Sequence, residues 1–349
     1  MKAALTHFLP LTLVRRARLL PAAGKVLVRY AQSVSATEVI ARAHLGNRHV
    51  LVDIARALRI APEKAASVCD RKVGETVQQG DILADMGGIL RRVVRAPADG
   101  EIVAFQSGKL LLEVASAALE LKAGISGTVA EVFPERGAVI EGTGALAQGI
   151  WGNGLLESGL LHVLAKDPMD EFTPRRLQVS LRGAVVLAGH CRQVNALHAA
   201  AELPLRGLVL GSMTADLIPV ANALKFPVIL LEGFGRIPIN PVAFKFLETS
   251  HGREVCVNAA VLDDFEDQRP ELFIPLPASA ELPRETADLR PGMRVRMVTM
   301  PYAGQVGTIL TLKPEPVAII KGVRAQAAVV ELENQKKVTL PLANLDVLE

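Results

Sequence analysis

A short sequence pattern occurs twice in the first half of the chain, and it restricts the folds that this half can adopt. Residues 30–41 read YAQSVSATEVIA and residues 73–84 read VGETVQQGDILA, so a valine, an acidic residue, an aliphatic pair and an alanine recur in register. Residues 136–146 form a looser third copy, and a second unit, A-x-x-x-G-x-[VI], occurs at residues 96–102 and 123–129. Short aliphatic runs separated by glycine-containing turns predict small sandwiches or barrels of short strands.

These units resemble the biotinyl/lipoyl-like fold, also called the barrel-sandwich hybrid. Residues 74–84 and 96–103 match its two strand-turn-strand signatures best, and the resemblance covers residues 20–165. Carrier members of that family have a lysine at the tip of a hairpin, but residues 82–97 and 110–121 contain no lysine. We therefore expect scaffolding modules rather than swinging arms for biotin or lipoate, and we expect no cofactor.

The sequence changes character over residues 178–277. Hydrophobic runs at residues 183–189, 206–211, 226–231 and 254–258 read as strands, and helical patterns separate them. This alternation predicts βαβ units and a mainly parallel sheet. At about a hundred residues, the domain is too small for a full dinucleotide-binding fold.

Strand patterns return in residues 289–349, after a polar, proline-containing linker at residues 278–288. The alternation that follows Gly292, the Pro-Tyr-Ala-Gly turn at residues 301–304 and the closing residues 338–346 resemble a KOW-type SH3-like barrel. Such barrels occur in transcription elongation factors and some ribosomal proteins. The whole order of modules resembles an uncharacterised bacterial family, which has no assigned activity to carry over.

We therefore predict a multi-domain protein of β and α/β class. Tandem lipoyl-like β modules without a carrier lysine occupy residues 1–172, and a small, mainly parallel α/β domain occupies residues 173–277. The linker at residues 278–288 leads to a C-terminal KOW-like SH3 barrel at residues 289–349.

Composition favours an intracellular globular protein. Half of the 349 residues are hydrophobic, and the net charge of +3 is too small to imply nucleic acid by itself. The cysteines Cys69, Cys191 and Cys256 give no disulfide framework and no zinc spacing, so we expect a reducing, cytoplasmic compartment. The apolar residues 3–14 precede the basic cluster at residues 15–18, which is the reverse of a secretory signal. No segment reaches the roughly 18 apolar residues of a membrane span.

Polar residues follow three predicted strands of the α/β domain, where the carboxyl ends of parallel strands meet at one edge. Glycines there allow close approach of the backbone to a ligand, and an arginine can pair with a phosphate or carboxylate. We therefore identify a candidate site for a small anionic ligand, whose residues are His190, Ser212, Thr214, Glu232, Gly233, Gly235 and Arg236. The alternative interpretation is that these residues are helix caps, turn glycines and a polar strand end. No catalytic elbow or metal-ligand spacing is present, so we assign no catalytic residue and no metal ligand.

A second group of candidates could contact nucleic acid or a protein partner. In the C-terminal barrel these are Arg294, Arg296, Tyr302, Lys336 and Lys337. A dedicated RNA-binding surface usually has a denser basic stripe and more aromatic residues. The single tryptophan, Trp151, either anchors a partner or closes a β module as an aromatic plug.

These observations favour a non-enzymatic scaffold or adaptor subunit of a larger cytoplasmic complex, with protein partners. One alternative is an RNA-, transcription- or translation-associated factor that acts through the KOW-like barrel. Another is a subunit that binds an anionic ligand, or an enzyme subunit, using the α/β crevice. The ten Lys or Arg of residues 1–60, against Glu38 and Asp53, suit either an acidic partner or a solvated basic face.

Overall fold

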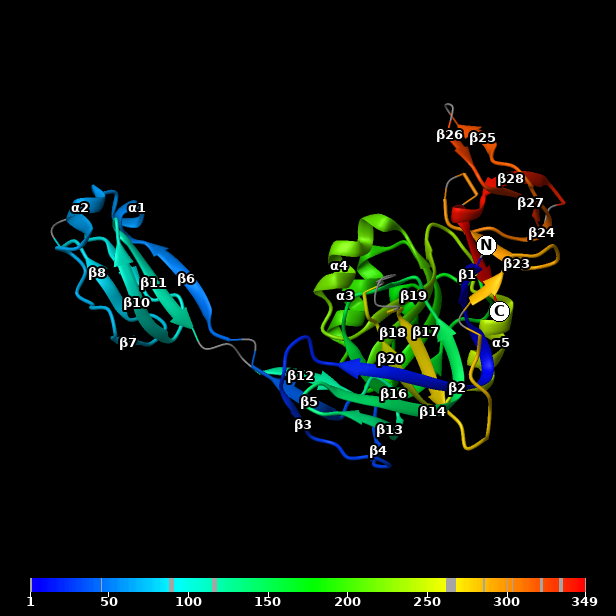
Figure 1. Ribbon diagram of the computed structural model, residues 1–349, viewed down its shortest axis with the longest axis horizontal. Helices are drawn as coiled ribbons and strands as arrows, with labels where there is room; N and C mark the ends of the chain where they lie inside the picture. Colours follow the sequence, from blue (N-terminus) through cyan, green and yellow to red (C-terminus); the bar gives the residue numbers. More distant parts are fainter. Residues whose placement is uncertain are drawn as a thin grey trace.

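The computed structural model is rich in β-strands, which form several sheets (Figure 1). Apart from short gaps, it describes nearly the whole chain. The described residues are 2–44, 46–87, 91–114, 118–261, 268–284, 286–299, 301–302, 304–320, 323–332 and 335–348.

The first strand does not belong to the first β module. β1 (Lys2–Thr6) pairs parallel to β29 (Leu345–Leu348) and antiparallel to β22 (Thr286–Asp288), so it lies in the sheet of the C-terminal domain, for which we keep the name barrel from the sequence prediction. Leu5 is buried in the barrel core. We predicted that residues 1–172 belong to the β modules, and the pairing of residues 2–6 corrects that prediction. A five-residue strand pattern shows which side chains are buried but not which distant strand will pair with it.

Two long strands connect the modules of the chain. β2 (Phe8–Leu19) and β14 (Gly137–Gln148) pair antiparallel from Gly137 opposite Leu19 to Ala147 opposite Phe8. β14 also pairs with β21 (Glu271–Pro275), which belongs to the α/β domain. One sheet therefore runs from the α/β domain into the first β module.

The two β modules are nested, whereas the sequence predicted tandem copies. The first module is built from segments on both sides of the second: β3 (Lys25–Val26), β4 (Ser33–Val34), β5 (Val39–Ala43), β12 (Leu119–Lys122) and β13 (Gly127–Phe133). β5 and β12 are paired neighbours, with Ala43 opposite Leu119. The second module is therefore an insertion between two adjacent strands.

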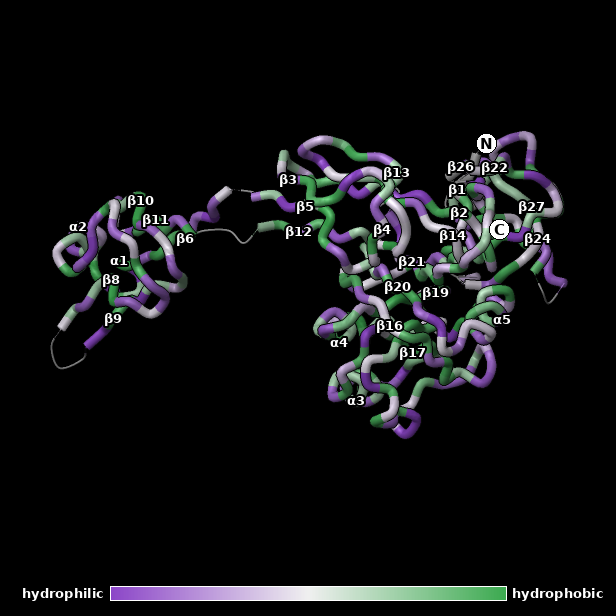
Figure 2. Tube along the Cα trace, turned by 90° about the horizontal axis from the view of Figure 1, so that it is seen from below, coloured by the Kyte–Doolittle hydropathy of each residue, from purple (hydrophilic) through white to green (hydrophobic). Residues whose placement is uncertain are grey.

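The inserted module has its own sheet and core. It comprises β6 (Arg48–Asp53), α1 (Ile54–Leu58), α2 (Pro62–Ala65), β7 (Thr76–Val77), β8 (Ile82–Asp85), β9 (Val93–Arg95), β10 (Gly100–Gln106) and β11 (Lys109–Val114). Ile54, Leu83 and Leu110 are among the fully buried residues of its core. The ribbon in Figure 1 and the perpendicular view in Figure 2 both place this module apart from the rest of the molecule.

The α/β domain has a sheet covered on both faces, and it begins before the predicted boundary at residue 173, because residues 151–152 and 156–163 contribute strands to this sheet. β16 (Leu156–Val163), β17 (Ala184–Cys191), β18 (Gly207–Met213) and β19 (Val228–Phe234) are parallel, whereas β20 (Glu254–Asn258), β21 and β15 (Trp151–Gly152) pair antiparallel with their neighbours. Residues of α3 (Val194–Glu202) and α4 (Ile218–Ala223) contribute to one core, and residues of α5 (Pro241–Thr249) contribute to the other.

The sheet of the C-terminal domain has the order β22-β1-β29-β23-β24-β27-β28. Its further strands are β23 (Arg294–Met297), β24 (Val306–Leu312), β27 (Ala327–Leu332) and β28 (Lys337–Pro341), and β25 (Val317–Ile320) pairs antiparallel with β26 (Val323–Ala325). Over the residues described, no helix combines the length and apolar character required to cross a membrane.

Candidate functional site

The predicted α/β crevice brings His190 and Ser212 together on neighbouring strands. His190 Nδ1 lies 2.9 Å from Ser212 Oγ, and both side chains are buried. The Ser212 hydroxyl donates to the Ile237 carbonyl oxygen (2.7 Å) and accepts from the Ile237 N–H (3.1 Å). Burial lowers the pKa of His190, which favours its neutral form. Ser212 therefore holds the loop after β19 in place, and its hydroxyl is not exposed to a substrate.

The chain itself covers the edge of the sheet beside His190. The main chain of Asp170 accepts from the His190 N–H (2.8 Å), and the Phe172 N–H donates to the His190 carbonyl oxygen (2.8 Å). The Ile239 N–H donates to the Pro168 carbonyl oxygen (2.9 Å). Residues 168–172 thus lie beside the end of β17, at the edge where a ligand was expected.

Glu232 makes internal contacts instead of facing an open crevice. Its carboxylate accepts from the Asn240 N–H (2.8 Å) and forms an ion pair with Arg296 (2.7 Å). Asn240 in turn caps α5, because its side-chain oxygen accepts from the Val242 N–H (2.9 Å). Glu232 therefore joins the sheet, helix α5 and the barrel.

The other crevice candidates are spread along the same edge. Gly233 has a φ of +104°, and a Cβ there would lie 2.2 Å from Ile150 Cδ1, so the position requires glycine. Gly235 also has a positive φ (+112°), and Arg236 is exposed. Thr214 Oγ1 is buried and has no hydrogen-bond partner among the residues described. The positive φ values of Gly233 and Gly235 agree with the alternative interpretation, in which these residues are turn glycines.

Arg296 lies in the interface between the barrel and the α/β domain. Its side chain is 1% exposed, and its guanidinium contacts the Glu232 carboxylate (2.7 Å), the Leu231 carbonyl oxygen (3.0 Å) and the Asp346 carboxylate (2.6 Å). Burial opposes the charged form of Arg296, but Glu232 and Asp346 outweigh burial and raise its pKa. We predicted Arg296 as a contact for nucleic acid or a partner, and this burial leaves it unavailable for such a contact.

The remaining barrel candidates lie on the surface or beside the core. Lys336 Nζ lies 5.2 Å from the centre of the Tyr302 ring, so one face of that ring is occupied. Lys337 pairs with Glu331 at 3.8 Å, and Arg294 is exposed. Arg294, Lys336 and Lys337 are therefore all exposed as basic side chains.

Trp151 packs within the protein. Its strand pairs with β19, and its ring meets the Phe234 ring edge-on, with the centroids 6.0 Å apart. The side chain is partly buried against the core of the α/β domain. Trp151 therefore packs against the α/β domain, and not inside a β module as the plug interpretation expected.

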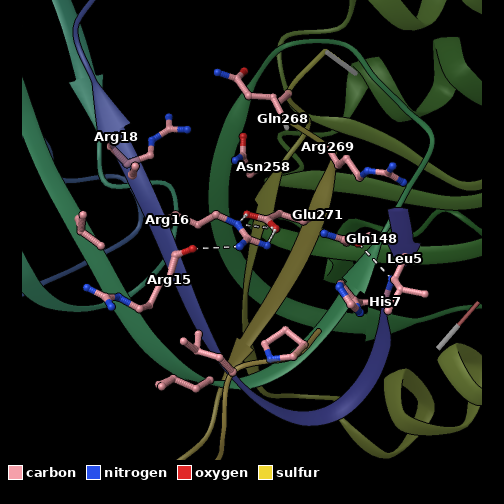
Figure 3. Close-up of a pocket in the computed structure, with 16 residues that line it drawn as sticks. Leu5, His7, Arg15, Arg16, Arg18, Gln148, Asn258, Gln268, Arg269 and Glu271 are labelled. Atoms are coloured by element: carbon pink, nitrogen blue, oxygen red, sulfur yellow. Dashed lines mark hydrogen bonds and ion pairs between the residues drawn. The ribbon is translucent and has the colours of Figure 1, made fainter. Parts of the chain in front are cut away.

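A pocket that the sequence analysis did not identify lies beside β2 (Figure 3). It has a volume of about 480 Å³, and Arg15, Arg16 and Arg18 of β2 contribute to its lining. Arg16 binds both carboxylate oxygens of the buried Glu271, with Nε–Oε1 at 3.0 Å and Nη2–Oε2 at 2.6 Å. The excess of basic residues in residues 1–60 was the available signal, but the residues opposite them come from distant segments.

A second pocket of about 550 Å³ adjoins the first and shares with it Arg18 and Asn258. Across the described parts of the chain, no cluster of three or more His, Cys, Asp or Glu residues could hold a metal ion. Comparison with models of known protein families finds no match to this chain, and a search of curated protein sequences likewise finds none.

Proposed function

We propose that this protein is a non-enzymatic scaffold or adaptor subunit of a larger cytoplasmic complex, and that the inserted β module provides its main protein-binding surface. The observation that supports this proposal best is the placement of residues 48–114. Their strands pair with one another and enclose a separate core, and the module enters and leaves beside the paired residues Ala43 and Leu119. A self-contained module on two connections can reach a partner without disturbing the body of the protein.

The edge of this module suits a partner that contributes a strand. The four-stranded sheet has the order β6-β11-β10-β7, which leaves β6 at one edge. Leu51 of β6 is 59% exposed, while Val50 and Val52 pack against the module core. An exposed edge strand offers unpaired N–H and C=O groups to an extended segment of another protein.

The test is co-purification from the native host with a matched deletion. The variant replaces residues 44–118 with an Asn-Gly turn, which suits a two-residue hairpin between Ala43 and Leu119. We expect the body to fold, and we expect a stoichiometric protein partner of the full-length protein to be lost from the variant. Retention of that partner by a folded variant would contradict the proposal.

Point variants separate the edge strand from the module as a whole. Leu51→Lys places a charge on the proposed edge, and we expect weaker partner binding with an unchanged melting temperature. Val73→Lys is the control, because Val73 is similarly exposed (57%) but lies outside the strands. Equal effects of the two variants would argue against strand addition at β6.

The nucleic-acid alternative has less support, because Arg296 is buried and Lys336 covers the Tyr302 ring. A nuclease arm in the same purification distinguishes the two functions. Partners that disappear after nuclease treatment, together with salt-sensitive RNA binding lost on Arg294→Ala, would favour the alternative.

A further inference from the structure

The arginines that line the pocket beside β2 are unequally neutralised. Arg15 pairs with Glu141 at 3.3 Å, and Arg16 is held by Glu271 through a bidentate contact. Arg18 has no carboxylate partner within hydrogen-bonding distance in the described structure. Its one hydrogen bond there runs from Nε to the Lys122 carbonyl oxygen, at 3.1 Å. The two terminal nitrogens of Arg18 therefore remain available to an acceptor.

The surroundings of Arg18 are partly dry, which strengthens an ionic contact. Burial lowers the pKa of the Arg18 guanidinium, and the nearby Arg16 lowers it further, although Glu271 acts in the opposite sense. The side chain passes over Gly124, where a Cβ would lie 3.2 Å from Arg18 Nε. Glycine at this position thus leaves room for the guanidinium.

Two adjoining pockets, of about 480 and 550 Å³, together form a larger hollow. Arg18 and Asn258 both line each of the two pockets. In Figure 3 the Arg18 side chain extends from β2 toward the side of the pocket that holds Asn258 and Gln268. Leu13 and Leu282 add apolar surface to the first pocket. A charged anchor in a partly apolar pocket of several hundred Å³ is typical of sites for small molecules.

We propose that this hollow binds a small molecule bearing an oxyanion, a phosphate or carboxylate, which the Arg18 guanidinium holds through two parallel hydrogen bonds. A planar guanidinium fits two oxygens of either group. The amide of Asn258 offers a further donor close to the same space. The site is separate from the α/β crevice and from the inserted module. Residues 262–267, which precede Gln268, lie outside the described structure and form no part of the proposed site.

The test is titration calorimetry on the full-length protein with four probes: inorganic phosphate, phenyl phosphate, benzoate and the neutral benzyl alcohol. We expect binding of phenyl phosphate or benzoate and no binding of benzyl alcohol. The comparison of phenyl phosphate with benzoate shows which oxyanion the site prefers. Binding of the neutral probe with equal affinity, or no binding by any anionic probe at millimolar concentration, would overturn the proposal.

Two variants test the role of Arg18 and of its neighbour. Arg18→Gln should weaken binding at least about tenfold, because it removes the charge-assisted contacts. Asn258→Asp keeps the shape of the pocket but adds a carboxylate to the lining that it shares with Arg18, and we expect it to abolish anion binding. Arg294→Gln is the charge-matched control and should bind like the natural protein. Unchanged affinity in folded Arg18→Gln and Asn258→Asp proteins would mean nonspecific binding elsewhere and would overturn the proposal.

Discussion

Replacing Arg296 with methionine should weaken the junction between the barrel and the α/β domain. The substitution leaves the Glu232 carboxylate, 2% exposed, without its counter-ion, and it removes one partner of Asp346. Loss of one member of a buried ion pair costs about 3–5 kcal/mol. Glu232 keeps the Asn240 N–H and Asp346 keeps the Thr6 hydroxyl (2.7 Å), so we expect about 3 kcal/mol, at the lower end of that range.

Urea unfolding, followed by a probe in the barrel and a probe in the α/β domain, measures this loss of free energy. Arg294→Met on the same strand is the control, because Arg294 is exposed, and it should change the free energy of unfolding by less than about 0.5 kcal/mol. Adding Glu232→Gln to Arg296→Met removes the stranded charge, so the double variant should be less destabilised than the sum of the two single variants. An Arg296→Met protein as stable as the Arg294→Met protein would refute this reasoning.

Three further predictions follow from burial and backbone conformation. Burial raises the pKa of the Cys191 thiol to about 11, whereas Cys69 is only partly buried. Cys69 should therefore react with Ellman's reagent before Cys191 in the folded protein. A faster reaction of Cys191 would contradict its buried placement. Burial lowers the pKa of His190 in the folded protein below the value of about 6.5 in the unfolded chain. The neutral His190 side chain therefore contributes its full stabilisation above about pH 6.5, and this stabilisation is lost as the pH falls from there through the lowered folded-state pKa. His190→Gln should therefore make the free energy of unfolding, measured by urea titration, depend less steeply on pH between pH 6.5 and 5. An unchanged pH dependence of the free energy of unfolding would mean that other groups cause it. Gly304 has a φ of +77°, and a Cβ there would lie 2.3 Å from a side-chain carbon of the loop after β19. Gly304→Ala should therefore lower the melting temperature more than Gly292→Ala, because a Cβ at Gly292 meets nothing within 4 Å. Equal shifts of the melting temperature would contradict the packing of the turn at Gly304.

Local sequence patterns predicted the short strands well but not their partners. The repeated segments at residues 30–41 and 73–84 contain β4 and most of β5 in the first copy and β7 and most of β8 in the second. The nesting of the modules was not predicted, because it depends on the pairing of β5 with β12 across about eighty residues. Pairing over such separations is determined by packing of the whole chain, which leaves little trace in a local pattern.

The candidate site shows the same limit. The strand patterns predicted that His190 and Ser212 lie at the ends of two parallel strands, and in the structure these strands are neighbours and the two side chains form a hydrogen bond. The strand patterns could not show that the main chain of Ile237 would form hydrogen bonds with the Ser212 hydroxyl. They also could not show that Arg296, from another domain, would pair with Glu232. Arg296 looks like any surface arginine in the sequence, because its burial is decided by two carboxylates from other segments.

The most direct test of the central claim uses the inserted module alone, residues 46–114, because its core is formed by its own residues. The isolated module is first checked for folding by heteronuclear NMR and then added in excess to the complex formed by the full-length protein and its partner. We predict that the free module displaces the full-length protein from the partner, and that the Leu51→Lys module does so less well. A folded module that leaves the complex intact at any concentration would contradict the account.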